Sequence, residues 1–67
     1  MLTGRVIWFV STVGLGFIRP DDGSPDVVVR MDEVAAAGLT TLEVDQHLAF
    51  EVKEEGMKRR ALNLNAV

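Results

Sequence analysis

Short runs of β-branched and aromatic residues, each closed by turn-forming residues, constrain the fold of this chain more than any other feature. Such side chains favour the pleated surface of a sheet, and alternation of apolar and polar residues with a period of two marks a half-buried strand. In Gln46–Lys53, for example, Leu48, Phe50 and Val52 fall on one face. The strands predicted in this way are Leu2–Val10, Val13–Ile18, Asp26–Met31, Gln46–Lys53 and Ala61–Asn65.

One segment, Asp32–Gly38, favours a helix instead of a strand. Asp32 is a residue type that caps helix starts, the alanines after Val34 propagate a helix, and Gly38 is a typical stop. Because nucleation costs more than a few hydrogen bonds return, we expect only a turn or two here.

Five short strands and one helical turn after the third predict an all-β fold, a five-stranded antiparallel sheet that closes on itself. Closure hides the strand edges that a sheet in a 67-residue chain cannot cover in another way. Glu54–Gly56 supplies the turn between the last two strands, as in a hairpin. No linker or repeat interrupts the chain, so we expect one domain over residues 1–67.

Composition narrows the classes of function. The chain has no cysteine, which excludes disulfides and thiolate metal sites, and 48% hydrophobic residues suffice for one core. The longest run without a charge, Val6–Ile18, is too short and too rich in glycine to cross a bilayer, and no signal pattern precedes it. We therefore expect a cytoplasmic protein with no membrane partner. A net charge of −3 disfavours attraction of phosphate by bulk charge.

The sequence offers no catalytic constellation. His47 has no serine or cysteine partner, and the adjacent carboxylates lie in turns or at a helix start, where solvation or capping explains them. Walker, dinucleotide-binding and metal-ligand motifs are absent from the sequence. We expect no enzymatic activity, no cofactor, no metal and no small-molecule substrate.

Five short motifs occur in this chain, and their order and spacings together are specific enough to indicate one protein family. The last of them is the ending of the chain, which alternates asparagine with leucine. The motifs are Gly4–Phe9, Gly14–Gly23, Asp26–Val29, Ala37–Leu42 and Ala61–Leu64. Over its full length the chain resembles the bacterial cold-shock proteins, and this resemblance implies an OB-fold-like barrel.

The resemblance also implies a function, namely binding of single-stranded RNA or DNA on the outer face of the first three strands. The family acts as nucleic-acid chaperones or regulators in stress responses, and its bases stack on aromatic residues of the first strand and of two ribonucleoprotein-like motifs. Here these motifs correspond to Val13–Ile18 and Val27–Met31. Stacking of this kind tolerates sequence variation because every base has a π-face.

The expected binding residues follow from these matches. Trp8, Phe9 and Phe17 stand at stacking positions, whereas the family's other aromatics are replaced by aliphatic residues and its usual histidine by Arg30. The lysines of the first strand and first motif are replaced by Ile7 and Val13. The complete expected site is Trp8, Phe9, Leu15, Phe17, Val28, Arg30, Met31, Lys58, Arg59 and Arg60, the last three in the loop before the final strand.

Alternative interpretations apply to the same residues. Phe9 and Phe17 are compatible with the core, and Lys58–Arg60 with a solvated turn. The aliphatic replacements are Ile7, Val13, Leu15, Val28, Met31 and Leu39. If these six residues share the outer face, they form an apolar patch, which favours a protein-interaction or homodimerisation module with weak or no nucleic-acid binding.

Overall fold

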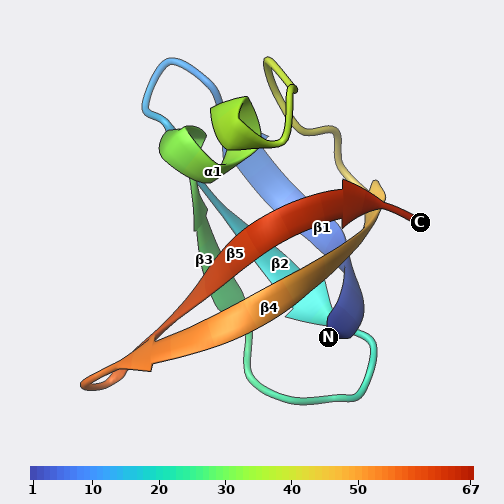
Figure 1. Cartoon of the computed structure of the whole chain (residues 1–67), viewed down its shortest axis with the longest axis vertical. Helices are drawn as coiled ribbons and strands as arrows, with labels where there is room; N and C mark the ends of the chain where they lie inside the picture. The colour runs from blue at the N-terminus through green and yellow to red at the C-terminus, as the bar shows by residue number, and fades with distance from the viewer.

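The strands close into a barrel through a single parallel contact. The computed structural model describes residues 1–67, and the strand order around the barrel is β1-β2-β3-β5-β4 (Figure 1). The elements are β1 (Leu2–Val10), β2 (Leu15–Pro20), β3 (Val27–Arg30), α1 (Met31–Ala36), β4 (His47–Glu55) and β5 (Lys58–Ala66). All neighbours pair antiparallel except β3 and β5, which pair parallel where Val28 meets Arg60. The predicted five-stranded barrel is confirmed, with this one exception to its antiparallel pairing.

The boundaries of four strands differ from the prediction, and those of β3 differ by only one residue at each end. β2 begins at Leu15 because the N–H groups of Val13 and Gly14 both donate to the carbonyl of Val10, which makes this segment a turn. β4 and β5 continue to a tight turn at Gly56 and Met57, and their hairpin extends beyond the barrel (Figure 1). The prediction that Lys58–Arg60 form a loop is therefore wrong, since the cross-strand pairing of the hairpin includes them.

The helix is present, but Asp32 does not cap it. α1 begins at Met31, whose N–H donates to the carbonyl of Gly14 at 3.0 Å, and the N-cap residue is Arg30, with no side-chain cap. The contact to Gly14 starts the helix one residue earlier than the sequence indicates. Gly38 ends it as predicted, with a φ of 80°. α1 lies across one end of the barrel (Figure 1). Val34 of this helix is fully buried in the core.

The core consists only of apolar side chains from all five strands, α1 and the β3–β4 loop. The largest fully buried side chains are those of Phe50, Ile18 and Leu48, and no polar or charged residue is buried. The complete set is Val6, Ile18, Val27, Val29, Val34, Leu42, Leu48, Phe50, Ala61 and Leu64. Outer faces of the same strands therefore carry the polar, aromatic and half-buried side chains that can meet a ligand.

Because Ile18 is fully buried, Ile18→Val should lower the free energy of unfolding by about 1 kcal/mol through the loss of one methylene. Val13→Ala, at a side chain 70% exposed, should change it by less than about 0.5 kcal/mol. Urea denaturation followed by Trp8 fluorescence measures both. Equal effects of the two substitutions would contradict the assignment of the core.

Candidate nucleic-acid interface

Side chains on the outer face of the barrel form one row that crosses all five strands. Trp8 pairs with Phe17, Phe17 with Val28, Val28 with Arg60, and Arg60 with Lys53. Side chains directly opposite each other on neighbouring strands lie about 5 Å apart, so the members of this outer row are contiguous. The row is aromatic on β1 and β2 and basic on β5 and β4.

A β-bulge in β1 gives Trp8 its place in the row. Val6 pairs with Ile18 in the core, and the register between β1 and β2 then shifts before Trp8, which leaves Ile7 as the extra residue. In a regular strand Trp8 would share the inner face with Val6, because side chains two residues apart point to the same side. The bulge turns Trp8 outward, and its side chain is 39% exposed.

The same bulge turns Phe9 toward the core. Phe9 pairs with Gly16, is half-buried and packs against the core cluster. Gly16 leaves room for this ring, since a Cβ at that position would lie 2.7 Å from Phe9 Cδ1. Phe9 therefore stands outside the outer row and supports β1 from within.

The two aromatic rings of the row meet edge to face. The centroids of Trp8 and Phe17 are 5.2 Å apart, and their planes differ by 65°. Rings inclined in this way cannot lie flat on a single base, so each ring offers its own face to a different base. The geometry suits two successive unstacked bases.

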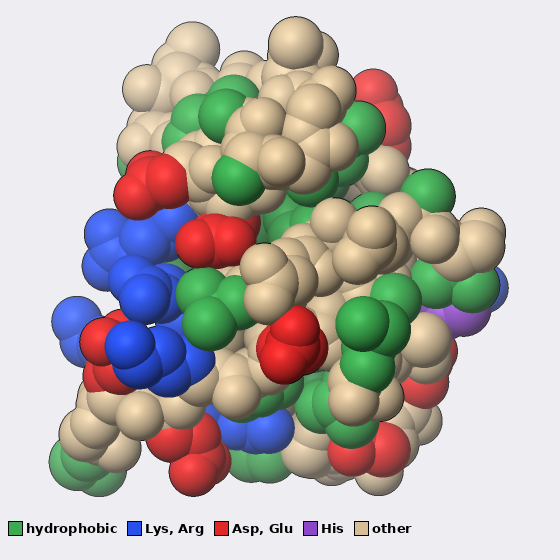
Figure 2. All heavy atoms as spheres, viewed as in Figure 1, with side chains coloured by type: hydrophobic (Ala, Val, Ile, Leu, Met, Phe, Trp, Pro, Cys, Tyr) green, Lys and Arg blue, Asp and Glu red, His purple; other side chains and the backbone are tan.

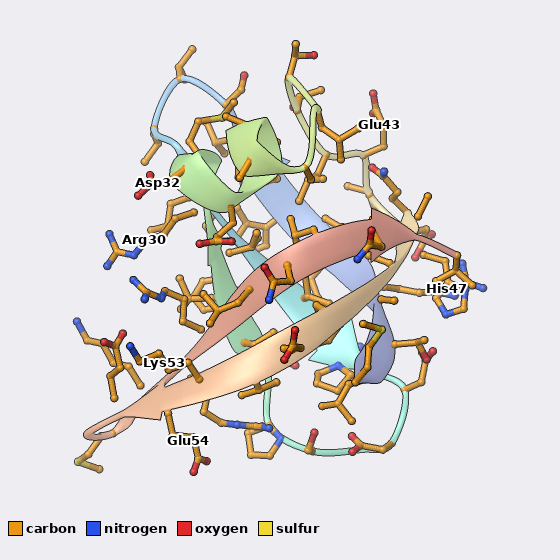
Figure 3. The ribbon with its side chains drawn as sticks, viewed as in Figure 1. Arg30, Asp32, Glu43, His47, Lys53 and Glu54 are labelled. Atoms are coloured by element: carbon orange, nitrogen blue, oxygen red, sulfur yellow. The ribbon has the colours of Figure 1, made fainter.

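Four basic residues gather at the other end of the row. Figure 2 shows blue side chains along one edge of the molecule, and Figure 3 places Arg30 of β3 and Lys53 of β4 at this edge. Arg60 pairs with Lys53, and Lys58 lies two residues before Arg60 on the same face of β5. We call Arg30, Lys53, Lys58 and Arg60 the basic cluster.

A carboxylate lies within the basic cluster. Glu55 Oε2 is 3.9 Å from Lys53 Nζ, and Glu55 Oε1 is 3.6 Å from Arg60 Nε. Any phosphate that binds here competes with Glu55 for these two cations. Sequence reasoning missed Lys53, although its position opposite Arg60 across the hairpin follows from alternation once the turn is placed at Gly56 and Met57.

Arg59 points away from the basic cluster. Its Nη1 donates to the carbonyl of Pro25 at 2.6 Å, its Nε lies 3.6 Å from Glu54 Oε1, and its side chain is 19% exposed. Glu54 projects from the other side of β4 than Lys53 (Figure 3). Arg59 therefore ties the hairpin to the β2–β3 loop.

The predicted aliphatic contacts are divided between the surface and the core. Leu15 and Val28 are half-buried on the outer face, where Leu15 pairs with Arg30. Met31 and Leu39 are half-buried and pack against the core cluster, at the end of the barrel that α1 covers. The six aliphatic replacements thus do not all lie on one outer patch.

His47 belongs to a structural network at the opposite end of β1. His47 Nε2 lies 2.8 Å from Asp21 Oδ2, and Thr3 Oγ1 donates to the same oxygen at 2.8 Å. The hydrogen bond with His47, and next the one from Thr3, lower the pKa of the Asp21 carboxyl below 3.8. The neighbouring Asp22 also has a lowered pKa, because the hydroxyl and N–H of Ser24 donate to it. No group of three His, Asp or Glu side chains is arranged to hold a metal ion.

A family model described as the "cold-shock" DNA-binding domain matches residues 2–67. The chain belongs to this family. The cold-shock domain has relatives of similar length, among them a probable cold shock protein of Sinorhizobium fredii, 46% identical over 98% of this chain and 99% of the relative. A cold shock-like protein of Rickettsia typhi is 40% identical over 94% and 90% of the two chains. A probable cold shock protein of Mycolicibacterium smegmatis is 39% identical over the whole of both.

Membership in the cold-shock domain family supports nucleic-acid binding of the cold-shock type in general. The single helix of this domain, α1, has six residues, and the structure contains no helix with the length and apolarity of a membrane span.

Since the pKa of Asp21 is lowered by folding, this carboxylate stabilises the fold at pH values above about 3.8, and the contribution disappears as pH falls through the folded-state pKa. Asp21→Asn should therefore lower the urea midpoint at pH 7 and leave it nearly unchanged at pH 2. Midpoints of both proteins measured from pH 2 to pH 7 check this, with Glu43→Gln as a control for loss of one charge. A constant difference between wild type and Asp21→Asn at all pH values would contradict it.

Proposed function

We propose that this cold-shock domain binds single-stranded RNA or DNA across the outer row, with bases on Trp8 and Phe17 and phosphates at the basic cluster. The observation that carries the proposal is the outer row together with the basic cluster at its end, which put two exposed or half-buried aromatic rings and four cations on one continuous surface. Family membership supports the same class of ligand.

Stacking supplies the first part of the binding free energy. A base that stacks on an aromatic side chain contributes about 1–3 kcal/mol to the binding free energy. Because the planes of the two rings differ by 65°, each ring stacks on a different base. Val28 and Leu15 continue this surface toward β3 with apolar contact only. Because an aliphatic side chain replaces the π-face, each of these positions contributes less than an aromatic residue would.

Charge supplies the second part, and it does so locally. The chain as a whole carries a net charge of −3, which repels a polyanion at long range. The basic cluster gathers four cations over β3, β4 and β5, and their charge acts on a strand that lies within about one Debye length. Arg30 adds a planar guanidinium, which can pair with phosphate in a bidentate way and also stack on a base.

A chaperone activity on structured RNA follows from the preference for unpaired bases. A protein that binds only the open strand stabilises it by mass action and shifts the equilibrium of a hairpin toward melting. The closed barrel is suited to this role because its stacking surface is held by the core and needs no rearrangement to receive a strand.

Binding of a pyrimidine-rich single strand should quench the fluorescence of Trp8, the only tryptophan. Phe17→Ala should weaken the binding by about five- to hundredfold, because one stacking face is lost while Trp8 still reports. Thr40→Ala, at an exposed side chain of the β3–β4 loop, serves as the control and should leave Kd unchanged. Absence of both quenching and electrophoretic retardation at low salt would overturn the proposed function.

The carboxylate of Glu55 should oppose binding, since it lies against two cations of the basic cluster. We expect Glu55→Gln to tighten binding by about two- to fivefold. Lys53→Gln should weaken binding and reduce the slope of log K against log salt by about 0.7, the value for one phosphate contact with a single strand. Fluorescence titrations at several salt concentrations measure both quantities.

Glu43→Gln is the matched control for Glu55→Gln, because it removes one negative charge from the β3–β4 loop. An equal gain in affinity from both substitutions would show that only net charge matters, and would contradict a specific role for the basic cluster.

The alternative function, a protein-interaction or homodimerisation module, draws on Val10 and Val13, which are 43% and 70% exposed. Sedimentation of the protein used in the titration tests it directly. A concentration-dependent dimer without quenching of Trp8 would favour this alternative over nucleic-acid binding.

A further inference from the structure

A groove of about 700 Å³ lies beside the aromatic end of the outer row, and none of the proposed stacking or phosphate contacts uses it. It is bounded by β1, β2 and the loops that follow β2 and precede β4. Arg5 and Arg19, which are register partners on β1 and β2, both line it. Ile7 and Val44 provide apolar surface, and Val44 is 66% exposed.

The groove is one nucleotide away from the stacking rings. Arg19 lies two residues after Phe17 on the outer face of β2, a distance of about 7 Å along the strand. On β1 the groove residue Ile7 directly precedes Trp8. A nucleotide that follows the base on Trp8 can therefore enter the groove without crossing the barrel.

The charges of the groove favour a neutral ligand over a phosphate. Three aspartates, Asp21, Asp26 and Asp45, line it together with the two arginines. Asp21 already accepts bonds from His47 and Thr3 and is not free to take further partners with the same oxygen. The net negative lining repels a phosphate, whereas a base with both donors and acceptors on one edge can satisfy both signs.

Arg19 and Asp26 are the pair best placed to read such an edge. Arg19 Nε lies 3.7 Å from Asp26 Oδ1, and the two side chains are 70% and 45% exposed. An exposed pair of this kind is worth little by itself, so exchanging it for bonds to a ligand costs little. Arg5 is held by the loop that precedes β4, because its Nη1 donates to the carbonyl of Asp45 at 3.0 Å.

We infer that this groove is a guanine site, an inference that rests on the proposed function. Guanine presents two acceptors, N7 and O6, next to two donors, N1–H and N2–H₂, along one continuous edge. A guanidinium matches the two acceptors in a bidentate way, and a carboxylate matches the two donors. No other base offers both pairs side by side. Arg19 takes O6 and N7, Asp26 takes N1–H and N2–H, and the guanidinium of Arg5 lies along the groove with Ile7 and Val44.

The test uses a uridine hexamer extended at either end by one guanosine, one adenosine or one abasic nucleotide, with quenching of Trp8 as the readout. At one of the two ends guanosine should bind about tenfold more tightly than adenosine, the discrimination expected of a good bidentate pair. The abasic extension should give no gain over the hexamer. A full gain from the abasic nucleotide would show that the groove binds phosphate, and would overturn the inference.

Arg19→Lys and Asp26→Asn should each reduce the ratio of guanosine to adenosine affinity to near one. Arg19→Lys keeps the charge and removes the planar fork, so it separates bidentate recognition from electrostatic attraction. Arg30→Lys makes the same chemical change outside the groove and should leave the ratio as in the wild type. An unchanged ratio in Arg19→Lys, or equal affinities for guanosine and adenosine at both ends, would overturn the guanine site.

The unextended hexamer separates the two hypotheses. If it quenches Trp8 but the extensions show no guanosine preference, the guanine site fails and the proposed function stands. If the hexamer itself does not bind, the proposed function is wrong, and the guanine site, which rests on it, is wrong as well.

Discussion

The bulge at Ile7 is the constraint on which the binding face depends. It allows β1 to place Val6 in the core, fully buried opposite Ile18, and Trp8 outside, opposite Phe17. In a regular strand both side chains would point to the same face, so Trp8 would be buried together with Val6. The bulge also directs Phe9 over Gly16, so the inner contacts that hold β1 in position lie next to the exposed ring of Trp8. The β-bulge at Ile7 thus accounts both for the inner packing of β1 and for the exposure of Trp8.

Barrel closure has a corresponding effect at the basic end. The parallel contact between β3 and β5 places Arg60 beside Val28, and the β4–β5 hairpin then places Lys53 beside Arg60. Residues that are far apart in the sequence become one row because the sheet has no edge between them. Glu55 moderates the field of this row by its position between two of the cations. The proposed phosphate contacts therefore depend on this local group of cations and not on the net charge of the chain, which is −3.

The sequence predicted the barrel and the order of its elements, because alternation and turn residues are local signals. Through the family resemblance it also indicated Trp8, Phe9 and Phe17 as stacking aromatics, of which Phe9 instead packs against the core. It could not predict the exclusion of Arg59, since the carbonyl that holds this side chain belongs to Pro25 on a distant loop. Lys53 was missed for a related reason, namely that its role depends on the register of a hairpin whose turn was placed one or two residues too early. The groove beside Arg5 and Arg19 requires two loops and two strands together, and no motif in the sequence marks it.

The proposed function requires that charge along the outer face compensates for the aromatic residues that this domain lacks. In the proposed binding mode the stacking energy comes from Trp8 and Phe17, whose rings are inclined by 65° and offer their faces to separate bases. Beyond Val28 the surface changes from apolar side chains to cations, so in the proposed binding mode a strand places its bases on β1 and β2 and its phosphates on β3, β5 and β4. Since phosphate contacts are insensitive to base identity, discrimination among sequences has to arise at the β1–β2 end. This is the end at which Arg19 and Asp26 stand side by side.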